Sequence, residues 1–75
     1  MMDKGMFSAR VRSLRSQTKR SASVTSELIG LSPSAFRRYE TGERMPSVEA
    51  VILIADYFGV STDYLLGLTD DVQRG

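Results

Sequence analysis

Gly30 is the residue that most constrains how this chain can fold, because it lies between two short stretches with a helical pattern. A helix that ends and reverses direction commonly needs a residue with positive φ, which glycine adopts without a Cβ clash. Ser32 and Pro33 follow at once. A serine oxygen can accept a hydrogen bond from a free N–H of a first helical turn, and proline fits the first helical position. The sequence therefore predicts that one helix ends and another begins within about three residues.

Apolar side chains recur at helical spacing along the rest of the chain. The first predicted helix covers residues 7–18, with Phe7, Val11 and Leu14 on one face. The others cover residues 22–29, 33–41, 48–58 and 62–66, with Ser21, Ser47 and Ser61 as N-caps and Gly30, Gly42, Gly59 and Gly67 after the last residues. No stretch alternates as a strand does, so we predict an all-α bundle of five helices.

The length of 75 residues suits one small domain, which buries only about 60% of the surface that its unfolded chain exposes. We expect a flexible leader over residues 1–6, the folded domain over residues 7–68 and a tail over residues 69–75. The chain has no cysteine and no histidine, so it has no disulfide and lacks the usual ligands of a structural zinc. Packed helices must therefore supply the stability.

The composition also argues against two broad classes of protein. No apolar run approaches the length of a transmembrane helix, and the first residues have no signal-peptide core, so we expect a cytoplasmic protein without a membrane partner. Without histidine, cysteine, a phosphate-binding glycine loop or an evident carboxylate pair, nothing is placed for acid–base or nucleophilic catalysis. We expect no enzyme, no cofactor, no metal and no small-molecule substrate.

Charge is distributed unevenly along the chain. Residues 1–46 hold nine Lys/Arg and four Asp/Glu, a balance of +5, and residues 47–75 hold one Arg and five acidic residues, a balance of −4, which together give the net charge of +1. A basic half joined to an acidic half indicates one surface for a polyanion and another for a different role.

The predicted helix over residues 33–41 has one apolar and one basic side. At about 100° per residue, the buried side carries Ala35, Phe36 and Tyr39, and the exposed side carries Pro33, Ser34, Arg37, Arg38 and Thr41. Arginine can bond a guanine bidentately or neutralise a phosphate. Taken alone, the two arginines are better explained as a solvated helix face. Combined with the turn at Gly30, they favour a helix-turn-helix whose second helix is presented to DNA.

Several motifs together resemble the phage-repressor type of helix-turn-helix DNA-binding domain, the Cro/cI or XRE-like family. They are Leu14-Arg15, Gly30-Leu31-Ser32, the run Arg-Tyr-Glu-Thr-Gly-Glu-Arg at 38–44, Pro46-Ser47, the run Ala-Asp-Tyr-Phe-Gly-Val-Ser at 55–61, and Asp-Tyr-Leu-Leu-Gly at 63–67. The resemblance covers about residues 7–68. It implies a compact lambda-repressor-like bundle, sequence-specific operator binding and usually a homodimer on a palindromic site.

The resemblance also implies roles for individual residues. It implies base contacts from Ser32, Pro33, Ser34, Arg37 and Arg38, and phosphate contacts near Ser21, Thr41 and Arg44. It implies that Arg15 pairs with Glu40 and so ties the first helix to the recognition helix. Such an arginine–carboxylate fork fixes orientation, and loss of one partner strands a charge.

The chain departs from the family pattern at three places. The usual Thr-Gln at the start of the second helix reads Ser21-Ala22, so the glutamine–phosphate contact is absent, and a later Leu-Ala pair reads Thr25-Ser26. Pro33 offers only its ring, for contact with a thymine methyl. The missing glutamine leaves open a protein-interaction module on the same fold, such as an antitoxin-like partner. The clustered arginines favour the leading hypothesis, a DNA-binding transcriptional regulator acting as a repressor.

A homodimer is predicted because one such domain covers little DNA, and two half-sites about one helical turn apart recover affinity. Tyr64, Leu65, Leu66 and Leu68 are the candidates for self-contact and, equally, for a lid over the core.

Overall fold

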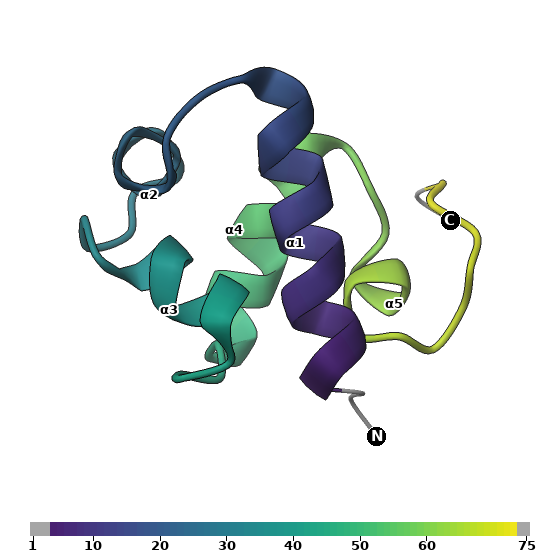
Figure 1. Ribbon diagram of the computed structural model, residues 1–75. Helices are drawn as coiled ribbons and strands as arrows, with labels where there is room; N and C mark the ends of the chain where they lie inside the picture. The colour runs from purple at the N-terminus through teal and green to yellow at the C-terminus, as the bar shows by residue number, and fades with distance from the viewer. Residues whose placement is uncertain (1–3, 74–75) are drawn as a thin grey trace.

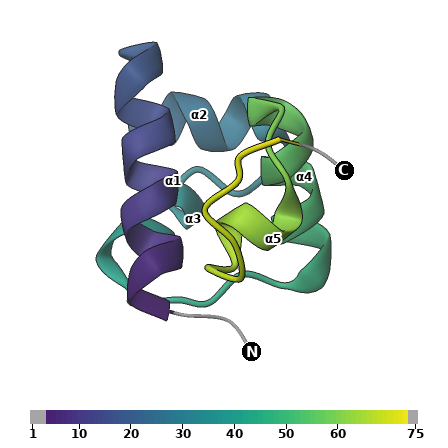
Figure 2. The same ribbon diagram turned by 90° about the vertical axis from the view of Figure 1, so that its right-hand side faces the viewer.

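The computed structural model describes residues 4–73, and over this range the chain is all-α, as predicted. It forms five helices: α1 (Lys4–Thr18), α2 (Ala22–Ile29), α3 (Ala35–Thr41), α4 (Val48–Phe58) and α5 (Thr62–Leu65). α2 and α3 lie on one side of α1, and α5 and the C-terminal segment lie on the other (Figure 1). Figure 2 shows α1 and α4 on opposite sides of the bundle. The first helix therefore separates the predicted DNA-binding elements from the end of the chain.

Aromatic and aliphatic side chains from all five helices form the core. The Tyr39 ring meets the Phe7 ring edge-on at a centroid distance of 5.9 Å, and the Phe36 ring at 6.4 Å. Phe36 also packs on Phe58, with centroids 6.1 Å apart. These contacts hold one face of α3 against α1 and α4, so the opposite face of α3 is left to solvent.

The predicted caps of α2, α4 and α5 are confirmed. Ser21, Ser47 and Ser61 each accept the backbone N–H of the residue three positions later, at 3.1, 3.0 and 2.9 Å. Gly30 follows α2 with φ of 97°, the left-handed conformation that its predicted role requires. The N–H groups of Gly30 and Leu31 both bond to carbonyls of the last turn of α2, which is the Schellman arrangement.

The predicted start of the first helix at residue 7 is wrong, and its predicted end at Thr18 is confirmed. α1 begins at Lys4, so residues 4–6, predicted as part of a flexible leader, are helical. No capping residue lies between Lys4 and Phe7, and Met6 is half-buried, so the helix continues one turn further back. Residues 1–3 of the predicted leader lie outside the described residues.

The predicted start of the third helix at Pro33 is also wrong, because α3 begins at Ala35. The N–H of Ala35 donates to the Ser32 carbonyl at 3.0 Å, and Ser34 has φ of −92° and ψ of −4°. These are the features of a type I turn, in which serine is favoured at the first position and proline at the second. Pro33 therefore shapes the turn instead of opening the helix. At the other end of the chain, α5 closes at Leu65, one residue earlier than predicted.

The C-terminal segment, predicted to be a tail outside the folded domain, packs on the domain as far as it is described. Arg10 of α1, only 11% exposed, donates to the carbonyls of Tyr64 and Thr69 at 2.5 and 2.6 Å. It also donates to the carboxylate of Asp70 at 2.7 Å, and its guanidinium carbon lies 4.0 Å from the Tyr64 ring centroid. Charge-assisted bonds of this kind offset the entropy lost by ordering the segment. Residues 74–75 lie outside the described part.

Arg10→Ala is expected to release residues 69–73 from α1 and to lower the free energy of unfolding by about 1–2 kcal/mol, because hydrogen bonds to a charged group are lost. Limited proteolysis near the C-terminus and urea denaturation would measure both effects. Asp70→Ala is the matched control. Asp70 is 98% exposed, and exposed ion pairs contribute little, so this variant should behave like the parent. Equal protease resistance in the two variants would contradict a latch at Arg10.

Candidate nucleic-acid interface

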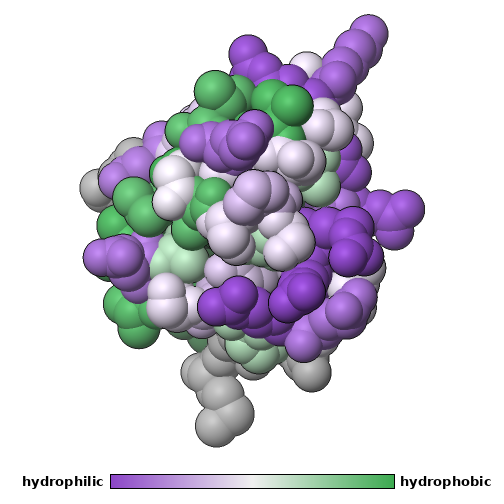
Figure 3. Space-filling model, turned by 90° about the vertical axis from the view of Figure 1, so that its left-hand side faces the viewer, coloured by the Kyte–Doolittle hydropathy of each residue, from purple (hydrophilic) through white to green (hydrophobic). Residues whose placement is uncertain are grey.

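The outward face of α3 carries Arg37 and Arg38, and both side chains are exposed. Ala35, Phe36 and Tyr39 of the same helix are buried, which confirms the two-sided helix predicted from the sequence. Figure 3 views the molecule from the side of α2 and α3. Strongly hydrophilic side chains gather at the right and along the lower part of this face, and apolar side chains at its top and left (Figure 3).

Ser32, Pro33 and Ser34 are exposed in the turn that leads into α3. The structure therefore brings these three predicted base-contacting residues to the N-terminal end of α3, directly before the helix that carries Arg37 and Arg38. They belong to the type I turn and not to the helix itself. The bond from the Ala35 N–H to the Ser32 carbonyl closes this turn and holds its backbone conformation.

The predicted phosphate contacts lie at the start and at the end of the motif. Ser21 caps α2, so its hydroxyl oxygen already accepts the Val24 N–H. Thr41 closes α3, and its hydroxyl lies 3.2 Å from the Arg38 carbonyl and 3.1 Å from the Glu43 carboxylate. Arg44 is exposed, and its backbone N–H donates to the Arg38 carbonyl at 3.3 Å. Glu43 thus places one negative charge beside the end of the basic helix.

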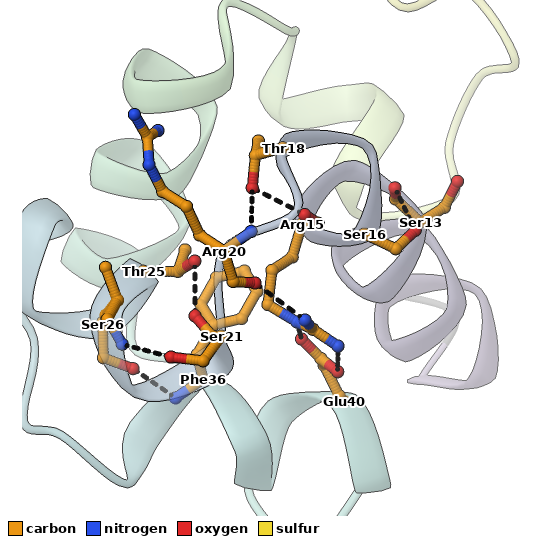
Figure 4. Close-up of polar contacts among 11 residues, drawn as sticks. Ser13, Arg15, Ser16, Thr18, Arg20, Ser21, Thr25, Ser26, Phe36 and Glu40 are labelled. Atoms are coloured by element: carbon orange, nitrogen blue, oxygen red, sulfur yellow. Dashed lines mark hydrogen bonds and ion pairs between the residues drawn. The ribbon is translucent and has the colours of Figure 1, made fainter.

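Arg15 joins three parts of the domain through one guanidinium group. Its Nε and Nη2 donate to the two carboxylate oxygens of Glu40 at 2.5 and 3.0 Å, and its Nη1 donates to the Arg20 carbonyl at 2.9 Å (Figure 4). The side chains are 22% and 9% exposed. The group therefore links α1 to α3 and to the loop that precedes α2.

The pKa of Arg15 is raised above its usual value, first by the hydrogen bond to Glu40 and further by the charge of Glu40, against the opposing effect of burial. The guanidinium therefore stays charged throughout the physiological range.

The two hydroxyl residues of α2 point inward, and sequence reasoning missed what they bond. Thr25 and Ser26 are buried. Thr25 Oγ1 donates to the Ser21 carbonyl at 2.9 Å, and Ser26 Oγ accepts the Phe36 N–H at 3.0 Å. The sequence signal that could have indicated these bonds is a pair of hydroxyl residues at inward-facing positions of a short helix. Val24 and Leu28, by contrast, are 43% and 54% exposed, so α2 presents apolar side chains outward.

Within residues 4–73, His, Cys, Asp and Glu form no group of three or more that a metal ion would need. The same part of the chain has no helix both long and apolar enough to cross a bilayer.

A family model described as a helix-turn-helix domain matches residues 7–69. The chain belongs to the helix-turn-helix domain family. The prediction of this family from the motifs around the turn at Gly30 is thereby confirmed.

Relatives of this helix-turn-helix domain come from bacteria and a phage. The HTH-type transcriptional regulator AnsR of Bacillus subtilis is 40% identical over 58 residues, which cover 77% of this chain and 50% of AnsR. The uncharacterized HTH-type transcriptional regulator YobD of the same organism is 36% identical, covering 88% of this chain and 59% of YobD. The cryptic phage CTXphi transcriptional repressor RstR of Vibrio cholerae is 32% identical, covering 87% of this chain and 60% of RstR. The chain thus spans about half to three-fifths of the length of these relatives.

A solved structure shows the same arrangement of helices. The solution structure of the SOS-response transcriptional repressor LexA from Eubacterium rectale matches with a TM-score of 0.78 at 27% identity, covering 84% of this chain and 67% of that chain. The predicted fold class is therefore confirmed.

Proposed function

We propose that the chain is a sequence-specific DNA-binding transcriptional regulator, acting as a repressor, that inserts α3 into the major groove. The observation that carries this proposal is the two-sided α3: Phe36 and Tyr39 fix it to the core, and Arg37 and Arg38 face outward. A slim basic helix presented after a tight turn has the geometry of major-groove readout. The names of the relatives, which are regulators and a repressor, support the same conclusion.

We assign base contacts to Ser32, Pro33, Ser34, Arg37 and Arg38. Phosphate contacts belong to Ser21, Thr41 and Arg44. The capped N-terminus of α2 supports a phosphate at Ser21, since free N–H groups and the helix dipole favour an anion there. Arg44 lies just after α3 and is exposed, which supports a phosphate contact there. Because these contacts release counterions, affinity should fall steeply with salt.

The regulator is proposed to act as a cytoplasmic homodimer, without an enzymatic role. Of the four candidate contact residues, Leu65 is fully buried and Tyr64 lies under Arg10, so these two serve the fold. Leu68 is exposed, and Leu66 lines a largely apolar groove together with Thr62, with Pro46 just before α4, and with Val48, Val51 and Ile52 of α4. Exposed apolar surface of this kind marks an association site. We propose that a second copy binds at this surface, so that the dimer carries two recognition helices.

Selection from a random duplex library, at moderate salt with competitor DNA, tests the proposal. We expect enrichment of a palindrome whose half-sites lie about one helical turn apart. The double variant Arg37→Ala/Arg38→Ala is the control, because it removes two exposed charges without touching the core, and it should enrich nothing.

Weak, salt-sensitive binding without any enriched sequence would contradict the proposal. It would favour the second candidate, a protein-interaction module, for which the exposed Val24 and Leu28 of α2 are the supporting observation. Sedimentation tests the dimer separately, since a monodisperse monomer at high micromolar concentration would refute intrinsic self-association.

A further inference from the structure

The recognition helix begins without a cap of its own. α2, α4 and α5 each start after a serine in extended conformation whose hydroxyl accepts an N–H of the first turn. Ser34 stands at the corresponding position before α3, with φ of −92° and ψ of −4°, and it makes no such bond. The first N–H groups of a helix have no partner within the helix, and those of α3 lie partly inside the core.

Ser26 of α2 supplies the missing bond from outside the helix. Its Oγ accepts the N–H of Phe36, the second residue of α3, at 3.0 Å, and both residues are buried (Figure 4). An N-cap side chain ordinarily bonds the N–H of the second or third helical residue. Ser26 therefore occupies the place of an N-cap in trans.

The backbone carbonyl of Ser26 bonds the other end of the connection between the two helices, where α2 ends. This carbonyl accepts the N–H groups of Gly30 and Leu31 at 3.1 and 2.8 Å. One residue thus closes the end of α2 through its carbonyl and holds the beginning of α3 through its hydroxyl. The turn over residues 30–34 is spanned by these two sets of bonds.

We propose that Ser26 is a positioning residue for DNA recognition: by capping α3 in trans, it fixes the angle between α2 and α3 and hence where Arg37 and Arg38 meet the bases. The inference rests on the proposed function. The two arginines directly follow Phe36, so a change at the Phe36 N–H is carried to them within the first turn. An alanine at position 26 would keep the close approach of the helices but would leave a buried N–H without an acceptor.

Ser26→Ala is the test variant and Thr25→Val is its matched control. Both remove one buried hydroxyl from α2, but the Thr25 hydroxyl bonds only to the Ser21 carbonyl, at the start of its own helix. Hydrogen exchange of the Phe36 amide, followed by NMR, reports the cap directly. Affinity for the selected operator and for competitor DNA reports recognition, at a temperature where both variants are fully folded.

In Ser26→Ala we expect the Phe36 amide to exchange about fivefold faster relative to Tyr39, as a lost cap of ~1 kcal/mol implies. Operator affinity should fall by about the same factor, while binding to competitor DNA, which depends on phosphate contacts, stays unchanged. Thr25→Val should leave the relative exchange of Phe36 and the ratio of operator to competitor affinity as in the parent chain.

Three results would overturn the inference. They are unchanged Phe36 exchange in Ser26→Ala, an equal loss of operator affinity in Thr25→Val, and a loss that is the same for operator and competitor DNA. If the parent chain selects no operator, the proposed function fails, while the exchange experiment still decides whether Ser26 caps α3. If Ser26→Ala does not fold, exchange of the Phe36 amide in the parent chain decides whether Ser26 caps α3. Without a cap, this amide would exchange as fast as amides that have no hydrogen-bond partner in the first turns of the other helices.

Discussion

Glu40→Ala is expected to lower the melting temperature by roughly 8–16 °C, the shift that corresponds to about 2 kcal/mol in a domain of this size. The carboxylate of Glu40 accepts two bonds from Arg15, and its removal leaves the guanidinium largely buried without a counter-charge. Breaking a fully buried pair costs about 3–5 kcal/mol. The partial exposure of Arg15 reduces that cost. Thermal unfolding followed by circular dichroism measures the shift.

A double-mutant cycle with Arg15→Ala isolates the interaction from the loss of each side chain. We expect the double variant to be more stable than the sum of the single losses predicts, because no charge is stranded when both partners are absent. Arg12→Ala, which removes an exposed arginine of the same helix, should leave the melting curve in place. An unshifted curve for Glu40→Ala would remove the claim that this pair holds α3 to α1.

The raised pKa of Arg15 gives this contribution a definite pH dependence. A cation whose pKa is higher in the folded state stabilises the fold fully at pH values below its unfolded pKa. That stability is lost only as the pH rises through the folded pKa. For a guanidinium this window lies in strong alkali, so the stability that Arg15 supplies should be constant from neutral pH to moderately alkaline pH.

Local signals predicted the parts of the fold that depend on neighbouring residues. The N-caps Ser21, Ser47 and Ser61 accept hydrogen bonds from residues three positions away, and Gly30 ends α2 through its own positive φ. Each of these roles can be predicted from a short stretch of sequence. Proline is favoured both at the first position of a helix and at the second position of a type I turn, so Pro33 was compatible with either structure. The Ser32–Ala35 bond selects the turn, and no neighbouring residue in the sequence distinguishes the two.

Residues whose partners are distant backbone groups escaped prediction. No residue near Arg10 in the sequence indicates its partners, and it bonds two carbonyls more than fifty positions away. Ser26 is visible in the sequence only as part of the pair that replaces the family's Leu-Ala, because an acceptor for the Phe36 N–H has no motif of its own. A carbonyl or an amide is present at nearly every position, so these contacts exist only once the packing is known.

Arg38→Ala is expected to weaken binding to the selected operator by about 1–3 kcal/mol, or roughly five- to 150-fold, and to leave the fold intact. Arg38 is exposed, and the residues that anchor α3 lie on its other side, so the melting temperature should not move. Arg12→Ala on α1 serves as the matched control for the loss of one exposed positive charge. Titration of labelled operator, with competitor DNA in parallel, measures both affinities. An unchanged operator affinity would make Arg38 a solvated charge.

Arg38→Lys then separates the two ways in which an arginine can contact DNA. Lysine keeps the charge but not the planar fork that bonds a guanine at two atoms. If Arg38 reads a base, the lysine variant should lose discrimination at one operator position while the salt dependence of binding stays as in the parent chain. If Arg38 only neutralises a phosphate, lysine should restore most of the affinity at every sequence. Arg37 is the neighbouring residue on α3. The same substitution at Arg37 therefore shows which of the two arginines contacts base edges and which contacts the DNA backbone.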